Sequence, residues 1–165
     1  MKNFKPLLSC RLFVALVVAT LFASGVAEAQ SAVPFKATVD ITELIQDPTE
    51  TDPCYQIGVI SGSGVATHLG KVTLVSRDCI IPKSPTEFAF YSNQLVLTVA
   101  NGDQIHATYI GTLTFEGTVG VITGDYYIIG GTGRYSLASG AGTVQGVEDL
   151  STGQGSVQLT GTISY

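Results

Sequence analysis

The two histidines, His68 and His106, are the residues whose chemistry is easiest to name. Imidazole binds Zn²⁺ and related ions, so both histidines together with a carboxylate would make a reasonable metal site. They lack the close His-x-His or His-x-x-x-His spacing that makes such a signal specific. His106 lies on the Thr-rich face of an expected strand, and His68 lies in the turn-like sequence Ala-Thr-His-Leu-Gly. We therefore expect structural or surface roles for both, and no metal site.

A cofactor site is also not indicated. Gly131-Thr132-Gly133 with Ser136 approaches the dinucleotide-binding pattern Gly-x-Gly-x-x-Gly but lacks its third glycine. No helix is expected to follow it, so no helix N-terminus would face a pyrophosphate. No serine lies in a Gly-x-Ser-x-Gly elbow, which argues against a Ser/His/Asp hydrolase. We expect no cofactor, and an enzyme is less favoured than a binding protein.

Cys54 and Cys79 are the cysteines of the expected mature chain, and they flank a predicted hairpin centred near Ala66-Thr67. Both lie about twelve residues from that centre, so a disulfide across the two strands is sterically allowed. Closing a loop of about 25 residues would stabilise the fold by roughly 3 kcal/mol. A reactive or metal-binding thiol pair is the alternative. The acidic segment from Asp47 to Pro53 has oxygen ligands that suit Ca²⁺, but a solvated loop is the simpler interpretation.

The first 29 residues are typical of a secretory signal peptide. Lys2, Lys5 and Arg11 precede an apolar run from Leu12 to Phe22, and Ala27-Glu28-Ala29 offers a cleavage site. Residues 30–165 are then expected to form one secreted or periplasmic domain with no stable membrane anchor. That domain has five Lys/Arg against twelve Asp/Glu, a formal charge of −7. An acidic domain of this kind has no basic surface for a phosphate backbone, so nucleic acid is not an expected partner.

Alternation of apolar and polar residues dominates the rest of the chain, as in Phe35, Ala37, Val39 and Ile41. Helix signals are nearly absent. Strands are expected at about 35–44, 55–65, 67–77, 86–91, 94–100, 104–116, 118–129, 140–150 and 155–165. Long strands in sequential hairpin order leave exposed edges unless the sheet closes. The sequence therefore predicts an all-β fold, a single antiparallel eight-stranded β-barrel, with a β-sandwich as the alternative.

One motif resembles a known family. Ile128 to Tyr135 (Ile-Ile-Gly-Gly-Thr-Gly-Arg-Tyr) is similar to a signature of dirigent proteins and of the related allene oxide cyclase barrels. In those families the motif ends a strand of an eight-stranded antiparallel barrel and begins the next turn. The resemblance covers about a quarter of the chain and is greatest to bacterial secreted members. It implies the fold, and it makes a homo-oligomer plausible, but we transfer no catalytic residue of those families to this chain.

Four residues are expected to contact a ligand in such a barrel: Asp40, Tyr109, Tyr127 and Arg134. Glu43 and Tyr126 are further residues of the types that a barrel cavity would use. The Arg134 guanidinium would contact an anion at the cavity mouth, whereas the alternative is that its side chain covers apolar surface.

Three functions follow from the expected barrel. The first is non-catalytic binding of a small hydrophobic or aromatic molecule, which needs an open apolar lumen of roughly several hundred cubic ångströms. The second is an oligomeric structural or interaction module with a filled core. The third is a cyclase- or dirigent-like enzyme, which needs a buried ionisable group with a perturbed pKa inside the lumen. The first is the expected function.

Overall fold

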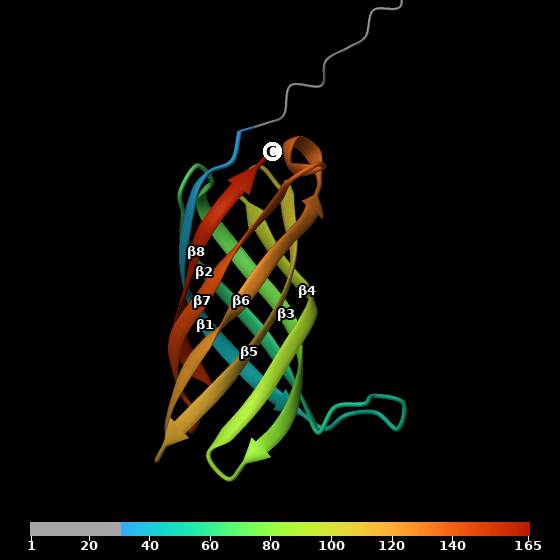
Figure 1. Ribbon diagram of the computed structural model, residues 1–165, viewed down its shortest axis with the longest axis vertical. Helices are drawn as coiled ribbons and strands as arrows, with labels where there is room; N and C mark the ends of the chain where they lie inside the picture. Colours follow the sequence, from blue (N-terminus) through green and yellow to red (C-terminus); the bar gives the residue numbers. More distant parts are fainter. Residues whose placement is uncertain (1–30) are drawn as a thin grey trace, which may run out of the picture.

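The computed structural model describes residues 31–165, which form a closed all-β barrel of eight antiparallel strands (Figure 1). This confirms the predicted fold class over the sandwich alternative. The strands are β1 (Val33–Gln46), β2 (Gln56–Ala66), β3 (Gly70–Ser84), β4 (Glu87–Val99), β5 (Gln104–Glu116), β6 (Val119–Gly131), β7 (Ser139–Asp149) and β8 (Gln154–Ser164). The predicted signal peptide, 1–29, lies outside the described residues.

Each strand pairs with its neighbours in the sequence, and β1 pairs with β8 to close the barrel. The closing register runs from Val33 opposite Ile163 to Thr42 opposite Gln154. Closure leaves no unpaired sheet edge, which is the physical reason that a chain of long sequential hairpins adopts this form. Over residues 31–165, no helix is long and apolar enough to cross a membrane.

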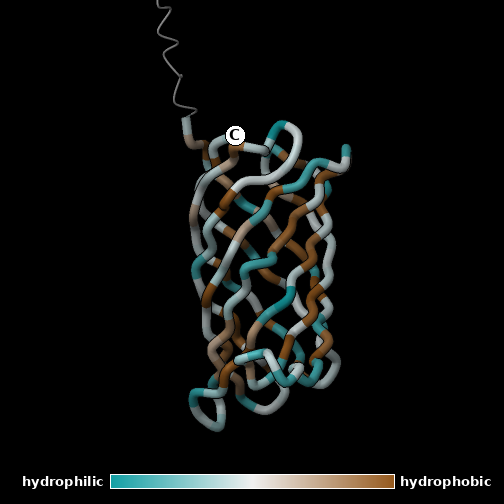
Figure 2. The backbone as a smooth tube through the Cα atoms, turned by 90° about the vertical axis from the view of Figure 1, so that its right-hand side faces the viewer, coloured by the Kyte–Doolittle hydropathy of each residue, from teal (hydrophilic) through white to brown (hydrophobic). Residues whose placement is uncertain are grey.

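The alternation of side chains along each strand separates the lumen from the outer wall. In β1, for example, Phe35, Ala37, Val39 and Ile41 are buried while the residues between them are exposed. Figure 2 shows this alternation as changes between apolar and polar colour along the strands. The inward apolar residues of all eight strands form one core cluster inside the barrel.

Two predicted strands, at about 86–91 and 94–100, are in fact the single strand β4. A β-bulge between Ser92 and Leu95 interrupts the register of β4 with β5, and the pairing with β3 shifts between Val75 and Cys79. A bulge inserts an extra residue and breaks the alternation, so one strand reads as two in the sequence. The connection from β3 to β4 is short, because β3 continues to Ser84 and β4 begins at Glu87.

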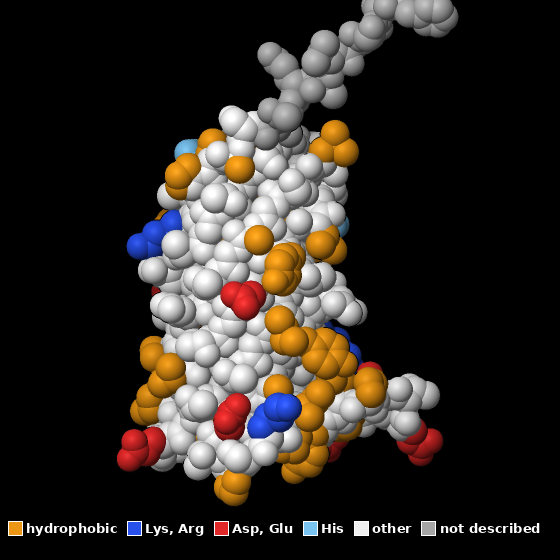
Figure 3. Space-filling model, in the orientation of Figure 1, with side chains coloured by type: hydrophobic (Ala, Val, Ile, Leu, Met, Phe, Trp, Pro, Cys, Tyr) orange, Lys and Arg blue, Asp and Glu red, His pale blue; other side chains and the backbone are white. Residues whose placement is uncertain are grey.

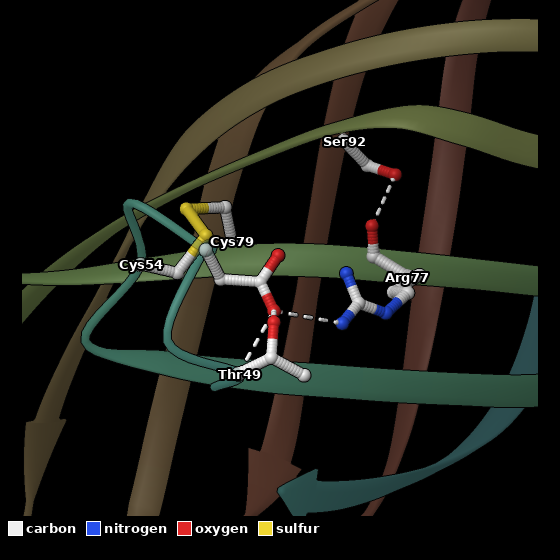
Figure 4. The surroundings of a disulfide bond; sticks show 6 residues. Thr49, Cys54, Arg77, Cys79 and Ser92 are labelled. Carbon is white, nitrogen blue, oxygen red and sulfur yellow. Dashed lines mark hydrogen bonds and ion pairs between the residues drawn. A yellow bond between two sulfur atoms is a disulfide. The ribbon is translucent and has the colours of Figure 1, made fainter. Parts of the chain in front are cut away.

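The predicted disulfide is confirmed, and Cys54 and Cys79 lie 5.2 Å apart at their Cα atoms. The ladder partner of Cys79 is Ile57, so Cys54 reaches the bridge from the loop that precedes β2 rather than from a facing position. In the same loop Asp52 accepts hydrogen bonds from Thr49 and forms an ion pair with Arg77 at 3.4 Å (Figure 4). The disulfide therefore fixes a protruding loop to the outer face of β3.

The upper end of the barrel is closed by the Gly-rich motif. After β6 the chain forms a short 3₁₀ turn, η1 (Gly133–Tyr135), which lies next to the C-terminus in Figure 1. Tyr135 is fully buried and packs edge-to-face on Tyr165 with ring centroids 5.0 Å apart. Gly133 has φ +55°, and a side chain there would collide with the Asp103 carboxylate. The motif thus makes a plug for this end of the lumen.

Candidate functional site

The lower half of the lumen is not filled. It holds a cavity of about 400 Å³ that ends near the lower rim, where β1, β3, β5 and β7 finish. A cavity of this size is within the range of small-molecule sites. Most of its lining is aliphatic or aromatic. The apolar lining residues include Ile41, Ile60, Leu74, Phe88, Phe90, Leu95, Leu113, Ile122, Val144 and Val157.

Three acidic side chains interrupt this apolar lining: Glu43 of β1, Asp78 of β3 and Glu148 of β7. We refer to them as the carboxyl cluster. Asp78 and Glu148 are each only 4% exposed. Glu43 continues the inward alternation of Val39 and Ile41, which is why a charged residue on an otherwise apolar face points into the lumen.

Glycines on the intervening strands allow the three acids to approach one another. Gly58 of β2 pairs with Asp78, and a Cβ at Gly58 would collide with the carboxylate of Glu43. Gly155 of β8 pairs with Glu148 on one side and with Ile41 on the other. Because neither glycine has a side chain, the Glu43 carboxyl group lies over Gly58 and interacts with Glu148 across β8.

This environment makes the carboxyl cluster hold protons at unusually high pH. Burial, reinforced by the charges of Glu148 and Asp78, raises the pKa of Glu43 from 4.5 to about 8. Burial also raises the pKa of Glu148, although its hydrogen bond with Glu43 opposes the rise. Burial raises the pKa of Asp78 to about 6. At neutral pH Glu43 therefore retains its proton, and the hydrogen bond between Glu43 and Glu148 holds that proton between the two acids.

Asp78 also belongs to a hydrogen-bonded network with side chains of β3, β4 and β5. The Tyr109 hydroxyl donates a hydrogen bond to Asp78 Oδ1, and Ser76 Oγ donates to the same oxygen at 3.1 Å. Ser76 Oγ also lies 2.8 Å from the Tyr109 hydroxyl and 3.0 Å from Ser92 Oγ. Ser92 immediately precedes the β4 bulge and donates to the Arg77 carbonyl oxygen at 2.8 Å (Figure 4). Burial and the Asp78 charge raise the pKa of Tyr109, which keeps its hydroxyl a donor.

Tyr126 lies at the deep end of the cavity. Its side chain is 1% exposed, and its hydroxyl has no hydrogen-bond partner among the described residues. The hydroxyl lies above the paired glycines Gly142 and Gly161, where a Cβ on either would be 2.7 Å from the oxygen. Burial raises the pKa of Tyr126 to about 12. A buried hydroxyl without a partner carries a desolvation cost that a ligand's polar atom would relieve.

Of the four residues expected to contact a ligand, the structure brings Tyr109 to the cavity and places the other three elsewhere. Asp40 and Tyr127 lie on the outer wall, because each occupies the outward position of its alternating strand. Arg134 lies at the plugged end, where its guanidinium is 4.7 Å from the Tyr135 ring centroid. Its side chain therefore covers apolar surface, which is the alternative that the sequence left open.

Sequence reasoning did not select Asp78 or Glu148 for the site. Each carries a usable signal, because Asp78 shares the inward alternation of Val72, Leu74 and Ser76. Glu148 has the same parity as Val144, but the glycine between them weakens the apolar pattern. The histidines lie apart from the cavity lining, with His68 Nε2 3.2 Å from the Pro34 carbonyl oxygen and His106 Nε2 3.1 Å from Gln104 Oε1.

Comparison with known proteins assigns no family to this geometry: no family model matches the chain, and no curated protein does. Across residues 31–165, no group of three or more His, Cys, Asp or Glu side chains has an arrangement that could hold a metal ion. The hydrogen bond between Glu43 and Glu148 makes these two acids a proton-sharing pair in an apolar cavity.

Proposed function

We propose that this protein is an exported barrel that binds a small, mainly apolar molecule in the lower half of its lumen. The observation that carries this proposal is the cavity of about 400 Å³, with its apolar lining and few convergent polar groups. A barrel that served only as a scaffold would gain stability by filling this space, because each buried cavity costs packing energy. The disulfide is in keeping with an oxidising compartment and so supports export.

A second candidate function is acid–base catalysis, such as the cyclisation chemistry of the dirigent and allene oxide cyclase barrels that the Gly-rich motif resembles. A specific observation favours it. Glu43, with a pKa of about 8, holds a transferable proton at neutral pH beside an apolar space. The Tyr109 hydroxyl, hydrogen-bonded to Asp78, offers a second donor beside the carboxyl cluster. The reaction would then depend on a substrate that the cavity holds in one orientation.

The oligomeric-module alternative relies on the outer wall instead. Exposed apolar side chains occur there on several strands, including Ile110, Val121, Tyr127 and Val147. Figure 3 shows such side chains in separate groups on a largely uncharged surface. Self-association through this wall is compatible with ligand binding, because the two use opposite faces of the same strands.

Native mass spectrometry of the protein purified from its own host tests the binding proposal. A small-molecule adduct that disappears on denaturation would support it and would supply the ligand's mass. The complementary measurement is fluorescence titration of the ligand-free protein with 2-(2-naphthyl)ethanol, a neutral probe small enough for the cavity.

A matched pair of variants locates the binding. Val144→Phe fills the lumen, and Val147→Phe places the same side chain on the outer face of the same strand. We expect Val144→Phe to weaken probe binding at least about tenfold, a loss of about 1.4 kcal/mol, and Val147→Phe to leave it unchanged. Circular dichroism would confirm that both variants fold. Equal binding by both variants would refute a lumen site.

A further inference from the structure

The ionisable residues that line the cavity are acidic, and no basic residue balances them among the described lining residues. The described lining residues include three carboxyl groups and neither Lys, Arg nor His. Asp78 accepts hydrogen bonds from Tyr109 and Ser76. Glu43 and Glu148 instead form a hydrogen bond with each other, so two acidic side chains lie in contact in the cavity. Two like charges in an apolar lumen are unfavourable unless a proton or another positive group lies between them.

The carboxyl cluster also has a definite position along the lumen. Glu43 and Glu148 lie near the lower rim, three and one residues before the ends of β1 and β7. Beyond them the cavity continues into an apolar section bounded by residues such as Leu74, Val157 and Leu159. The deep end is bounded by Tyr126, whose buried hydroxyl lies over Gly142 and Gly161 and has no partner among residues 31–165. The lumen therefore offers an acidic rim, an apolar middle and one unsatisfied polar atom at the far end.

We infer that the ligand is an apolar amine, whose protonated nitrogen replaces the shared proton between Glu43 and Glu148 while its hydrocarbon body occupies the section below Tyr126. This inference rests on the proposed function and names the ligand's chemical class. An ammonium group donates up to three hydrogen bonds and accepts none, which matches a group of carboxylate acceptors. An anionic ligand is disfavoured by the same carboxylates, and a neutral alcohol brings no positive charge to offset them.

The exchange of a proton for an ammonium group has a measurable consequence. Three ionisable side chains surround Glu43: Glu148 on β7, Asp78 on β3 and Tyr109 on β5. The two strands that flank β1 contribute only glycines near it, Gly58 on β2 and Gly155 on β8. An amine cation that binds between Glu43 and Glu148 releases the proton they share. The affinity for the amine therefore rises with pH between about 6 and 9, until the amine itself loses its proton.

Three probes with one carbon skeleton test the inference: 2-(2-naphthyl)ethylamine, 2-(2-naphthyl)ethanol and 2-naphthylacetic acid. At pH 7.5 we expect the amine to bind at least about tenfold more tightly than the alcohol, and the acid to bind most weakly. Calorimetry in two buffers of different ionisation enthalpy should show proton release with the amine and none with the alcohol. The amine-to-alcohol affinity ratio should fall to about one in Glu43→Gln and Glu148→Gln.

Glu116→Gln, an exposed acid at the end of β5, is the control and should leave the ratio unchanged. Removal of buried charge is not expected to unfold the barrel, and circular dichroism would verify this for each variant. If the alcohol binds as tightly as the amine, the assignment of an amine is overturned while lumen binding stands. If none of the three probes binds to the folded protein, the proposed function itself fails.

Discussion

Replacing Glu43 by glutamine should stabilise the barrel at alkaline pH. The pKa of Glu43 in the folded protein is about 8, above its ordinary value of 4.5. Between these values the folded protein binds more protons than the unfolded chain, so the free energy of unfolding falls as the pH rises. At about 1.4 kcal/mol for each pKa unit, the full difference corresponds to at most about 5 kcal/mol. Glu43 is only partly buried, so the expected cost is below this limit.

The assay is guanidinium denaturation, followed by circular dichroism, at several pH values from 5 to 9. The wild-type midpoint should decrease across this range, and the Glu43→Gln midpoint should decrease much less. Asp78 has a pKa of about 6, so it also lowers the midpoint as the pH rises, but at lower pH than Glu43. This contribution is the same in the wild type and in Glu43→Gln. Glu116→Gln should follow the wild type. Parallel curves for wild type and Glu43→Gln between pH 6 and 9 would refute the buried, proton-sharing description of the cluster.

Three further changes test other parts of the structure. Gly58→Ala should displace the Glu43 carboxyl group and lower its pKa, which ¹³C NMR titration of the carboxyl carbon would detect. An unchanged pKa would show that the missing side chain at Gly58 does not set the position of Glu43. The double variant Cys54→Ser/Cys79→Ser should lower the free energy of unfolding by roughly 3 kcal/mol and still form the barrel. Equal stability of variant and wild type would show that the disulfide does not stabilise the fold. Tyr126→Phe should be neutral or stabilising by about 1 kcal/mol, because the lost hydroxyl has no partner in residues 31–165; a clear loss would reveal a hydrogen bond there.

The sequence was sufficient for the barrel because alternation is a local property. Phe35 to Ile41 already separate lumen from outer wall, and Asn101-Gly102-Asp103 already marks the turn between β4 and β5. The strand prediction failed at the bulge after Ser92, where the extra residue changes which side chains of β4 point into the lumen. Nothing local distinguishes such a bulge from the end of a strand, since the missing information is the register with β3 and β5.

The site was harder to predict because it depends on neighbours across the sheet. The parity of Glu43 places it in the lumen, and the parity of Asp40 places it outside, so the first strand alone could have separated them. The meeting of Glu43 with Glu148 is different. It depends on the pairing of β1, β8 and β7, and on Gly155 lying between the two acids. Residues more than 100 positions apart are brought together only when the barrel closes.

The pairing of β1 with β8 has a consequence for how the chain folds. Every other ladder joins strands that are adjacent in the sequence, so those contacts form with short loops and little loss of chain entropy. The closing ladder instead joins Val33 to Ile163 and must bring together the two ends of the domain. We therefore expect the hairpins to assemble early and closure to be the late step that creates the lumen. Until that step the Glu43 and Glu148 carboxyl groups remain solvated and apart, so the cost of burying them falls on the last event of folding.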